Sequence, residues 1–531
     1  MDKRLLGAAL AAVVAIGLAA SGGAAQAKVF RWANDGDVNS MDPYARNETF
    51  LLTFDANMYE PLVGRDRSLK VEPALATEWK QTDPNVWRFK LRQGVKFHDG
   101  TPFTADDVIF SYQRVLMPGS NLSGNFATVK EIKKVDDFTV DVVTKSPDPI
   151  LPEELTSWAI LSKAWCEKNN AVKPADITKN EESFATRNEN GTGPFILKER
   201  QPDVKTVLVP NPNWWGKKEH NLDEVVFSII KDPLTRVSAL LSGEIDMIYN
   251  TPPEATDKIK ATKGLKLLQK AELRTIYLGL DQSRDELLES SVKGKNPLKD
   301  VRVRKAFYEA IDETAIAQKV MRGFAQPTAL LIGAGVNGFD ESINKRFPVN
   351  VADAKKLMAE AGYPTGFEIG MDCPNDRYVN DEQICQAVVA MLARIGVKVN
   401  LLAQPRAKFF AKVNEPAYNT SFFLLGWTPQ TYDAHNALLS LAATRNREKG
   451  TGIFNNGGYA DPKVDELVTQ IQGELDQAKR NKLIVQALTL VKDDFGYIPL
   501  HQQQVVWATR DTVNVVQLPD NYFPLRYVTV K

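Results

Sequence analysis

The sequence has few of the residues that carry most protein chemistry. It contains three cysteines and four histidines in 531 residues, and its 66 basic and 66 acidic side chains cancel. A net charge of zero gives no support for binding to nucleic acid or to an anionic membrane, since both need a concentrated basic face. We find no low-complexity tract and no fixed-period repeat, as expected for an ordinary soluble globular chain.

Signatures of common enzyme classes are missing as well. The four histidines, at positions 98, 220, 435 and 501, are not paired at the spacing of metal ligands. There is no nucleophile elbow, no H-E-x-x-H pair and no phosphate loop. We therefore predict no catalytic residue, no metal site and no cofactor. An exported hydrolase remains the rival class, because paired carboxylates need not be adjacent in the chain.

A long apolar run occurs once, at the N-terminus. Lys3 and Arg4 precede the run 5–20, and small residues then lead to Ala25-Gln26-Ala27, the pattern that signal peptidase cuts. This predicts a signal peptide over residues 1–27 and an exported mature chain without a membrane span. A transmembrane anchor is the weaker alternative, because the run is short and no basic stop-transfer flank follows it.

The three cysteines suit an exported protein. Cys373 and Cys385 are twelve positions apart, and Cys385 lies in a helical pattern that begins near Asn380. A disulfide between them would leave Cys166 unpaired. The alternative, three unpaired buried thiols, is equally consistent with the sequence, because free cysteine is a common core residue.

What the sequence does contain is an alternation of strand and helix patterns. Predicted helices begin at capping residues, for example Thr104 with Asp107, and Asp232 before Pro233. Further helices are expected at 49–63, 300–321, 353–362, 380–396 and 461–492. Strands are expected at 28–33, 87–91, 138–142, 225–230, 244–249, 397–401 and 505–508.

The order of these elements indicates an α/β protein with two lobes. The strand, helix and strand between residues 225 and 249 form a βαβ unit, which implies a parallel sheet. A chain of 531 residues exceeds one core and implies two or three domains. The joint at 191–194 and the late strand at 505–508 predict more than one crossing between the lobes, hence a hinge and a cleft.

One stretch has the character of a pocket wall. The apolar residues 422–425 suit a buried strand, and Gly426-Trp427 and a polar loop follow. We predict ligand contacts from Gly426, Trp427, Gln430, Tyr432, Asp433 and His435, because binding groups usually lie on loops held by a scaffold. Trp427 as a core aromatic is the alternative.

Two further positions are candidates for ligand binding. Arg377 could hold a ligand carboxylate with two hydrogen bonds, although a solvated surface arginine is equally consistent with the sequence. Asn39 lies in the loop that follows the first predicted strand, where it could face a ligand.

Several segments together resemble the family 5 extracellular solute-binding proteins, the dipeptide and oligopeptide receptors of ABC importers. The 89–112 run, FKLRQGVKFHDGTPFTADDVIFSY, is the most specific of them. The others are 75–79 (LATEW), 191–197 (GTGPFIL), 211–226, 236–245 and 301–311.

The resemblance implies a two-lobed periplasmic binding protein fold with a hinge and an extra inserted domain, the three-domain cluster C type. Lobe I would comprise residues 28–72, 192–285 and 506–531, the inserted domain 73–191, and lobe II 286–505. The resemblance also implies a monomeric receptor in the Gram-negative periplasm. It would capture a peptide or similar solute by hinge closure and deliver it to an importer of permease and two ATPase subunits.

The loop after Gly426-Trp427 departs from the peptide receptors. In these proteins an Asp three residues after the Trp pairs with the ligand amine, whereas this chain has Gln430. An ammonium would lose a charge-assisted contact worth roughly 1.5–3 kcal/mol there. Asp433 could replace it, or the ligand could lack an amine, as an opine, a sugar conjugate or a metal chelate does. The sequence 432–435 is similar to the Tyr-Asp-Pro-His of nickel-type members, which keeps chelates among the candidates.

Overall fold

The computed structural model describes residues 27–531, so the predicted signal peptide, apart from Ala27, lies outside the described residues. Its main feature is an eleven-stranded sheet with the order β15-β14-β16-β12-β17-β11-β1-β10-β9-β8, in which β13 pairs with β17. The strands are β1 (Val29–Asn34), β8 (Phe195–Gln201), β9 (Lys205–Pro210), β10 (Glu224–Ile229), β11 (Met247–Ile248), β12 (Leu265–Leu280), β13 (Ala325–Pro327), β14 (Glu368–Pro374), β15 (Lys398–Gln404), β16 (Phe422–Trp427) and β17 (Tyr497–Arg510).

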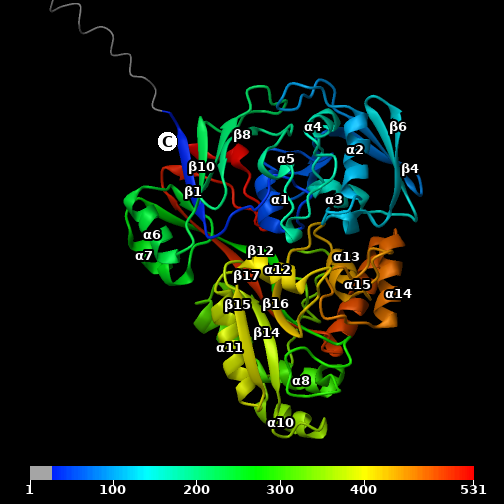
Figure 1. Cartoon of the computed structure of the whole chain (residues 1–531), viewed down its shortest axis with the longest axis vertical. Coiled ribbons are helices and arrows are strands. Elements are labelled where there is room, and N and C mark those ends of the chain that lie inside the picture. Colours follow the sequence, from blue (N-terminus) through cyan, green and yellow to red (C-terminus); the bar gives the residue numbers. More distant parts are fainter. Residues whose placement is uncertain (1–26) are drawn as a thin grey trace, which may run out of the picture.

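Two long strands connect the two halves of the molecule. β12 and β17 pair antiparallel from Leu265 opposite Arg510 to Gly279 opposite Tyr497, with a register shift between Ala271 and Thr275. The first part of this ladder adjoins β11, and the second part adjoins β16. In Figure 1 both strands run between the upper part, which holds β1 and β10, and the lower part, which holds β14 to β16.

The predicted βαβ unit is confirmed. β10 and β11 both pair parallel with β1, and helix α6 (Pro233–Ser242) connects them. The Asp232 side chain accepts a hydrogen bond from the Thr235 N–H at 2.7 Å, and Gly243 ends the helix with φ 87°. Only glycine adopts that conformation without strain, so the Asp-Pro start and glycine stop define this helix.

A second, four-stranded antiparallel sheet lies inside the segment 73–191. Its order is β4 (Ala76–Asp83), β5 (Val86–Leu91), β7 (Thr139–Thr144) and β6 (Val129–Asp136). Helix α2 (Ala105–Val115) begins with the predicted capping box, in which Thr104 and Asp107 bond to each other's backbone. One continuous apolar cluster joins this segment to the strands β1 and β10, so the two parts share a core.

Four helix predictions are wrong in detail. The helix from Asp300 ends early as α8 (Val301–Ala310), because Asp312 caps a separate turn, α9 (Glu313–Ala315). The predicted 49–63 helix is the shorter α1 (Thr49–Asp55), and Asn350, rather than Asp353, caps α10 (Val351–Glu360). Residues 461–492 form two helices, α14 (Pro462–Gly473) and α15 (Gln477–Asp493), because Asp476 caps a second start.

The remaining elements are short or cover the sheet. They are α3 (Leu151–Glu154), α4 (Lys163–Lys168), α5 (Phe184–Arg187), α7 (Thr256–Ala261), α11 (Asp381–Ala393), α12 (Arg406–Val413), α13 (Ala434–Ala437), β2 (Val63–Arg65), β3 (Val71–Pro73), β18 (Val513–Asn514) and β19 (Thr529–Val530). Among residues 27–531, no helix has the length and apolar character needed to cross a membrane.

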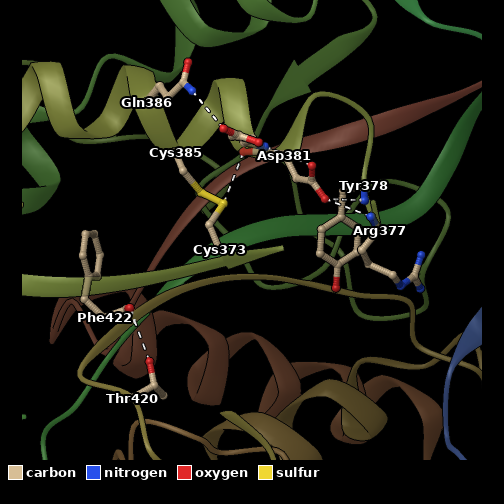
Figure 2. Close-up of a disulfide and its surroundings, with 9 residues drawn as sticks. Cys373, Arg377, Tyr378, Asp381, Cys385, Gln386, Thr420 and Phe422 are labelled. Atoms are coloured by element: carbon tan, nitrogen blue, oxygen red, sulfur yellow. Dashed lines mark hydrogen bonds between the residues drawn. A yellow bond between two sulfur atoms is a disulfide. The ribbon is translucent and has the colours of Figure 1, made fainter. Parts of the chain in front are cut away.

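A disulfide joins Cys373 on β14 to Cys385 on α11, which decides between the two alternatives for the cysteines (Figure 2). Cys166 is unpaired and buried. Beside the disulfide, the Asp381 carboxylate accepts the backbone N–H groups of Arg377 and Tyr378, each at 3.0 Å. The disulfide and this carboxylate fix the loop between β14 and α11, which carries Arg377.

Removing this disulfide should lower the free energy of unfolding. The bridge closes a loop of 12 positions, and chain entropy then predicts a loss of about 2–3 kcal/mol for the double variant Cys373→Ala/Cys385→Ala. Urea unfolding with and without reductant measures the effect. Reductant should shift the wild type to the same midpoint and leave the double variant unchanged; a midpoint that reductant does not move in the wild type would contradict this.

Candidate ligand-binding site

The predicted pocket wall lies at the seam between the two halves of the molecule. The end of β16, at Gly426 and Trp427, faces Asn47, Glu48 and Thr49 across a cavity of about 60 Å³, which we call the strand-end cavity. Three neighbouring cavities share residues with it. The outer cavity of about 180 Å³ shares Thr49, Thr428 and Gln430, and a small cavity of about 10 Å³, the arginine cavity, shares Thr49 and Arg377. A cavity of about 40 Å³ shares Gln430, Asn436 and Phe454.

Gly426 and Trp427 form one side of the strand-end cavity. The Trp427 indole N–H donates to the Asn436 side-chain oxygen at 2.9 Å, and its ring packs against Phe454 with centroids 5.1 Å apart. Gly426 has no room for a side chain, since a Cβ there would lie within 2.9 Å of Arg274 and Tyr378 atoms. The glycine therefore brings the β16 backbone up to its neighbours, and the tryptophan is held in one orientation.

Gln430 connects three segments of the chain. Its amide N–H donates to the Asn47 side-chain oxygen at 3.1 Å, and its carbonyl oxygen accepts from the Ser157 hydroxyl at 3.3 Å. Asn47 belongs to the N-terminal half and Ser157 to the segment 73–191, whereas Gln430 follows β16. The side chain thus closes the seam with neutral hydrogen bonds and borders both the strand-end and the outer cavity.

Arg377 also spans the seam. One of its terminal nitrogens lies 2.8 Å from the Glu48 carboxylate, and both side chains are more than nine-tenths buried. Burial by itself raises the pKa of Glu48, but Arg377, Arg406 and the Leu51 N–H outweigh burial and hold this pKa at about 2. Glu48 is therefore ionised, and the ion pair joins helix α1 to the loop that follows β14.

The other loop residues have different surroundings. Tyr432 borders the outer cavity, where its hydroxyl donates to Asp520 and Arg65 lies over its ring at 4.0 Å. His435 is fully buried beside the cavity of about 40 Å³, and its Nε2 has no partner among the described residues. Both residues stay candidates for ligand contact.

Asp433 and Asn39 border none of these four cavities. Asp433 caps α13 and accepts two hydrogen bonds from Arg480, at 2.5 and 2.8 Å. It therefore does not take the place of the missing carboxylate at Gln430. Asn39 is exposed, with φ 62°, which fits a turn residue better than a ligand contact.

Sequence reasoning missed several residues at the seam. Thr49 was predicted only as the start of a helix, and no role was predicted for Asn47, Glu48, Arg274, Arg406 or Asp520. No local pattern marks them, because each reaches the cavities through contacts with distant segments. A single arginine in a strand or helix usually indicates a solvated face.

Three buried histidines should make the protein sensitive to acid. Burial lowers the pKa of His220 and of His435 to about 4 and that of His501 to about 3. Both ring nitrogens of His501 lack partners among the described residues. The unfolded chain, with ordinary histidine pKa values of 6.5, binds more protons below that pH. The free energy of unfolding should therefore fall by several kcal/mol between pH 6.5 and about pH 4.

Urea unfolding at pH 7 and pH 5 measures this dependence. The variant His501→Phe removes one titrating group and leaves no hydrogen bond unmade, so its free energy of unfolding should change less between the two pH values. An equal change in the wild type and the variant would show that His501 does not contribute.

The fold and the seam define a class of protein. Two α/β halves connected by long strands, with cavities between them, are the architecture of the two-lobed periplasmic binding proteins. The model of the "Bacterial extracellular solute-binding proteins, family 5 Middle" matches residues 70–449. The chain belongs to this family.

Individual relatives agree with this assignment. The Heme-binding protein A of Haemophilus influenzae is 28% identical over 456 residues, which are 82% of this chain and 79% of that protein. The Glutathione-binding protein GsiB of Escherichia coli K12 is 24% identical over 491 residues, 91% of each chain. The periplasmic binding protein DppA of Helicobacter pylori, solved with the peptide STSA, superposes with TM-score 0.83 at 24% identity, covering 94% of this chain and 98% of that one.

Proposed function

We propose that this protein is the periplasmic receptor of an ABC importer, which captures a peptide or a similar small solute between its lobes and delivers it to the membrane permease. The proposal rests on one observation: Gly426 and Trp427 lie opposite Asn47–Thr49 across the strand-end cavity. A solute bound there contacts both halves and therefore stabilises the closed form, which is the form that docks on the permease.

The geometry also supports a solute that is not an ordinary peptide. Gln430 uses its amide on Asn47 and Ser157 and offers no charge to a ligand amine. The names of the relatives include heme as well as glutathione and a peptide. A metal chelate, an opine or a sugar conjugate on the same scaffold is therefore the second candidate class.

Thermal unfolding with a panel of solutes tests the receptor function. The panel contains the tetrapeptide Ser-Thr-Ser-Ala, glutathione, heme and the small-molecule fraction of a bacterial extract. We expect saturable stabilisation by at least one member and recovery of that solute unchanged. Conversion of a solute to product would instead identify the exported hydrolase, and no stabilisation by any member would reject the receptor function.

A further inference from the structure

The cavity of about 40 Å³ beside His435, which we call the histidine cavity, lies between the segment 73–191 and the region that follows β16. Glu154 is part of one wall, and His435 is part of the other. The two walls are in close contact, since a Cβ at Gly450 would lie 2.6 Å from the Ala127 Cβ. In Figure 1, α3, which ends at Glu154, lies above α13, which holds His435. Opening of the seam would separate the two walls and admit water.

Two acids lie next to each other at the first of these walls. The side chains of Asp148 and Glu154 are within hydrogen-bonding reach of each other. Asp148 is 1% exposed, and its Oδ1 accepts the Ile150 N–H at 3.2 Å. Its Oδ2 is shielded from water and has no hydrogen-bond partner among residues 27–531, because the nearby Thr128 hydroxyl does not donate to it.

A proton is what these two carboxyl groups need in order to bond to each other. Two carboxylates have no donor between them, whereas a protonated carboxyl group donates its O–H to the other. Two negative charges at this distance in a buried site also repel each other, which favours the retention of one proton. Burial and the Asp148 carboxyl raise the pKa of Glu154 well above its ordinary value of 4.5, and burial also raises the pKa of Asp148. The pair therefore holds a shared proton at pH values where a solvated glutamate has lost its own.

The charged groups around the pair do not replace this proton. Those that face it from the neighbouring segments are Glu153 of α3, Asp433 and His435 of the region after β16, Arg480 of α15 and Arg65 of the N-terminal half. Arg480 donates to both oxygens of Asp433, and Arg65 lies over the ring of Tyr432 at 4.0 Å, so both arginines are held elsewhere. His435 is neutral at pH 7, because burial lowers its pKa to about 4.

Opening of the seam would change the surroundings of Glu154 most. Glu154 is half-buried and lines the histidine cavity, whereas Asp148 is covered. Once the region after β16 has moved away, water reaches the Glu154 carboxyl group and solvates its charge, so its pKa falls toward the ordinary value. At neutral pH the proton then leaves to solvent, and it returns when the seam closes.

We propose that closure of the lobes on the solute takes up a proton, which Asp148 and Glu154 share, so that the receptor holds its solute more tightly as the pH falls. The inference rests on the proposed receptor function and adds a regulator to it. Above about pH 4.5 the closed form binds more protons than the open form, so a rise in pH favours the open form. The dissociation constant should therefore rise with pH, by up to about tenfold per pH unit, and should be constant below about pH 4.5.

Calorimetry between pH 5.5 and pH 7.5 tests the inference with the solute that binds, whether Ser-Thr-Ser-Ala, glutathione, heme or the compound recovered from the extract. We expect the dissociation constant of the wild type to rise about tenfold or more over this range. At pH 7, titrations in phosphate and in Tris, whose ionisation enthalpies differ, count the protons taken up on binding. We expect an uptake of about half a proton or more per solute molecule.

Two variants replace the shared proton by an amide N–H. Glu154→Gln and Asp148→Asn each leave one carboxylate and one amide donor, so the contact is kept but no longer titrates. We expect both variants to bind at pH 7.5 as tightly as the wild type binds at pH 5.5. Glu167→Gln on α4 is the control, because the Glu167 side chain is 55% exposed, and its pH dependence should equal that of the wild type. Circular dichroism confirms folding, and either amide variant is sufficient for the test.

Each contrary outcome has a distinct meaning. A dissociation constant that does not change with pH in the wild type, or that changes equally in the wild type and the amide variants, overturns the inference and leaves the receptor function standing. Binding that weakens toward low pH also overturns it, and would show that a histidine such as His435, rather than the acid pair, binds a proton on opening. If no solute of the panel or the extract binds at all, the receptor function fails and the inference fails with it.

Discussion

Replacing Arg480 by methionine is expected to lower the free energy of unfolding by about 3–5 kcal/mol, because the change leaves the Asp433 carboxylate buried without its partner. Arg480 is 1% exposed and donates to both oxygens of Asp433 and to the Ile471 carbonyl. Burial raises the pKa of Asp433, but the hydrogen bonds from Arg480 outweigh burial and keep this pKa below its ordinary value. Without Arg480, burial would be the dominant influence on the pKa of Asp433 and would raise it.

Urea unfolding of Arg480→Met at pH 7 measures the loss. The adjacent Lys479→Met is the matched control, because the Lys479 side chain is 69% exposed and its ion pair with Glu474 lies at the surface. Its effect should be within about 0.5 kcal/mol. A loss of less than about 1 kcal/mol in Arg480→Met would mean that Asp433 finds another partner. Because Asp433 caps α13, the variant should also bind ligand more weakly.

Trp427→Ala is expected to weaken solute binding by more than tenfold, about 1.4 kcal/mol or more, with the fold intact. The indole is half-buried, borders the strand-end cavity, and is held by Asn436 and Phe454. Removing it takes away a large rigid apolar surface against which the solute packs. Trp427→Phe keeps most of that surface and should lose much less.

Calorimetry with the identified solute gives the dissociation constants of the wild type and both variants. Near-ultraviolet and far-ultraviolet circular dichroism show whether the fold is retained. Equal affinities in the wild type and Trp427→Ala would place the solute elsewhere. A large loss in Trp427→Phe as well would indicate that the hydrogen bond to Asn436, rather than the apolar surface, matters most.

Local signals predicted the parts of the fold that depend on local interactions. The capping box at Thr104 and the Asp-Pro start of α6 formed as expected, because the atoms involved lie within four residues of one another. The apolar run before Gly426 became β16, a strand buried between β12 and β14. The predicted helix lengths were wrong where a second capping residue begins a new helix, as Asp312 and Asp476 do.

The site could be predicted only in part, because much of it is assembled from distant segments. Three residues of the site lie close together at the end of one strand: Gly426, Trp427 and Gln430. The change from apolar to polar residues at this point predicted a pocket wall. By contrast, the ion pair of Arg377 with Glu48 joins two segments that are far apart in the sequence. Likewise, no residue near Asp433 in the sequence indicates that its ion-pair partner is Arg480, 47 positions away.

The contacts of the Gln430 amide show what the difference from the peptide receptors at position 430 does in this structure. An aspartate at this position would add a charge close to Glu48, whereas the amide satisfies Asn47 and Ser157 and remains neutral. A ligand amine would therefore find no charged partner at this position.

The most direct test of the central claim is native mass spectrometry of the mature protein purified without denaturation. We expect one small molecule bound per chain in the wild type, and we expect Trp427→Ala to lose it. A protein that shows only its own mass, even after exposure to a bacterial extract, would contradict the claim that the seam is a solute-binding site.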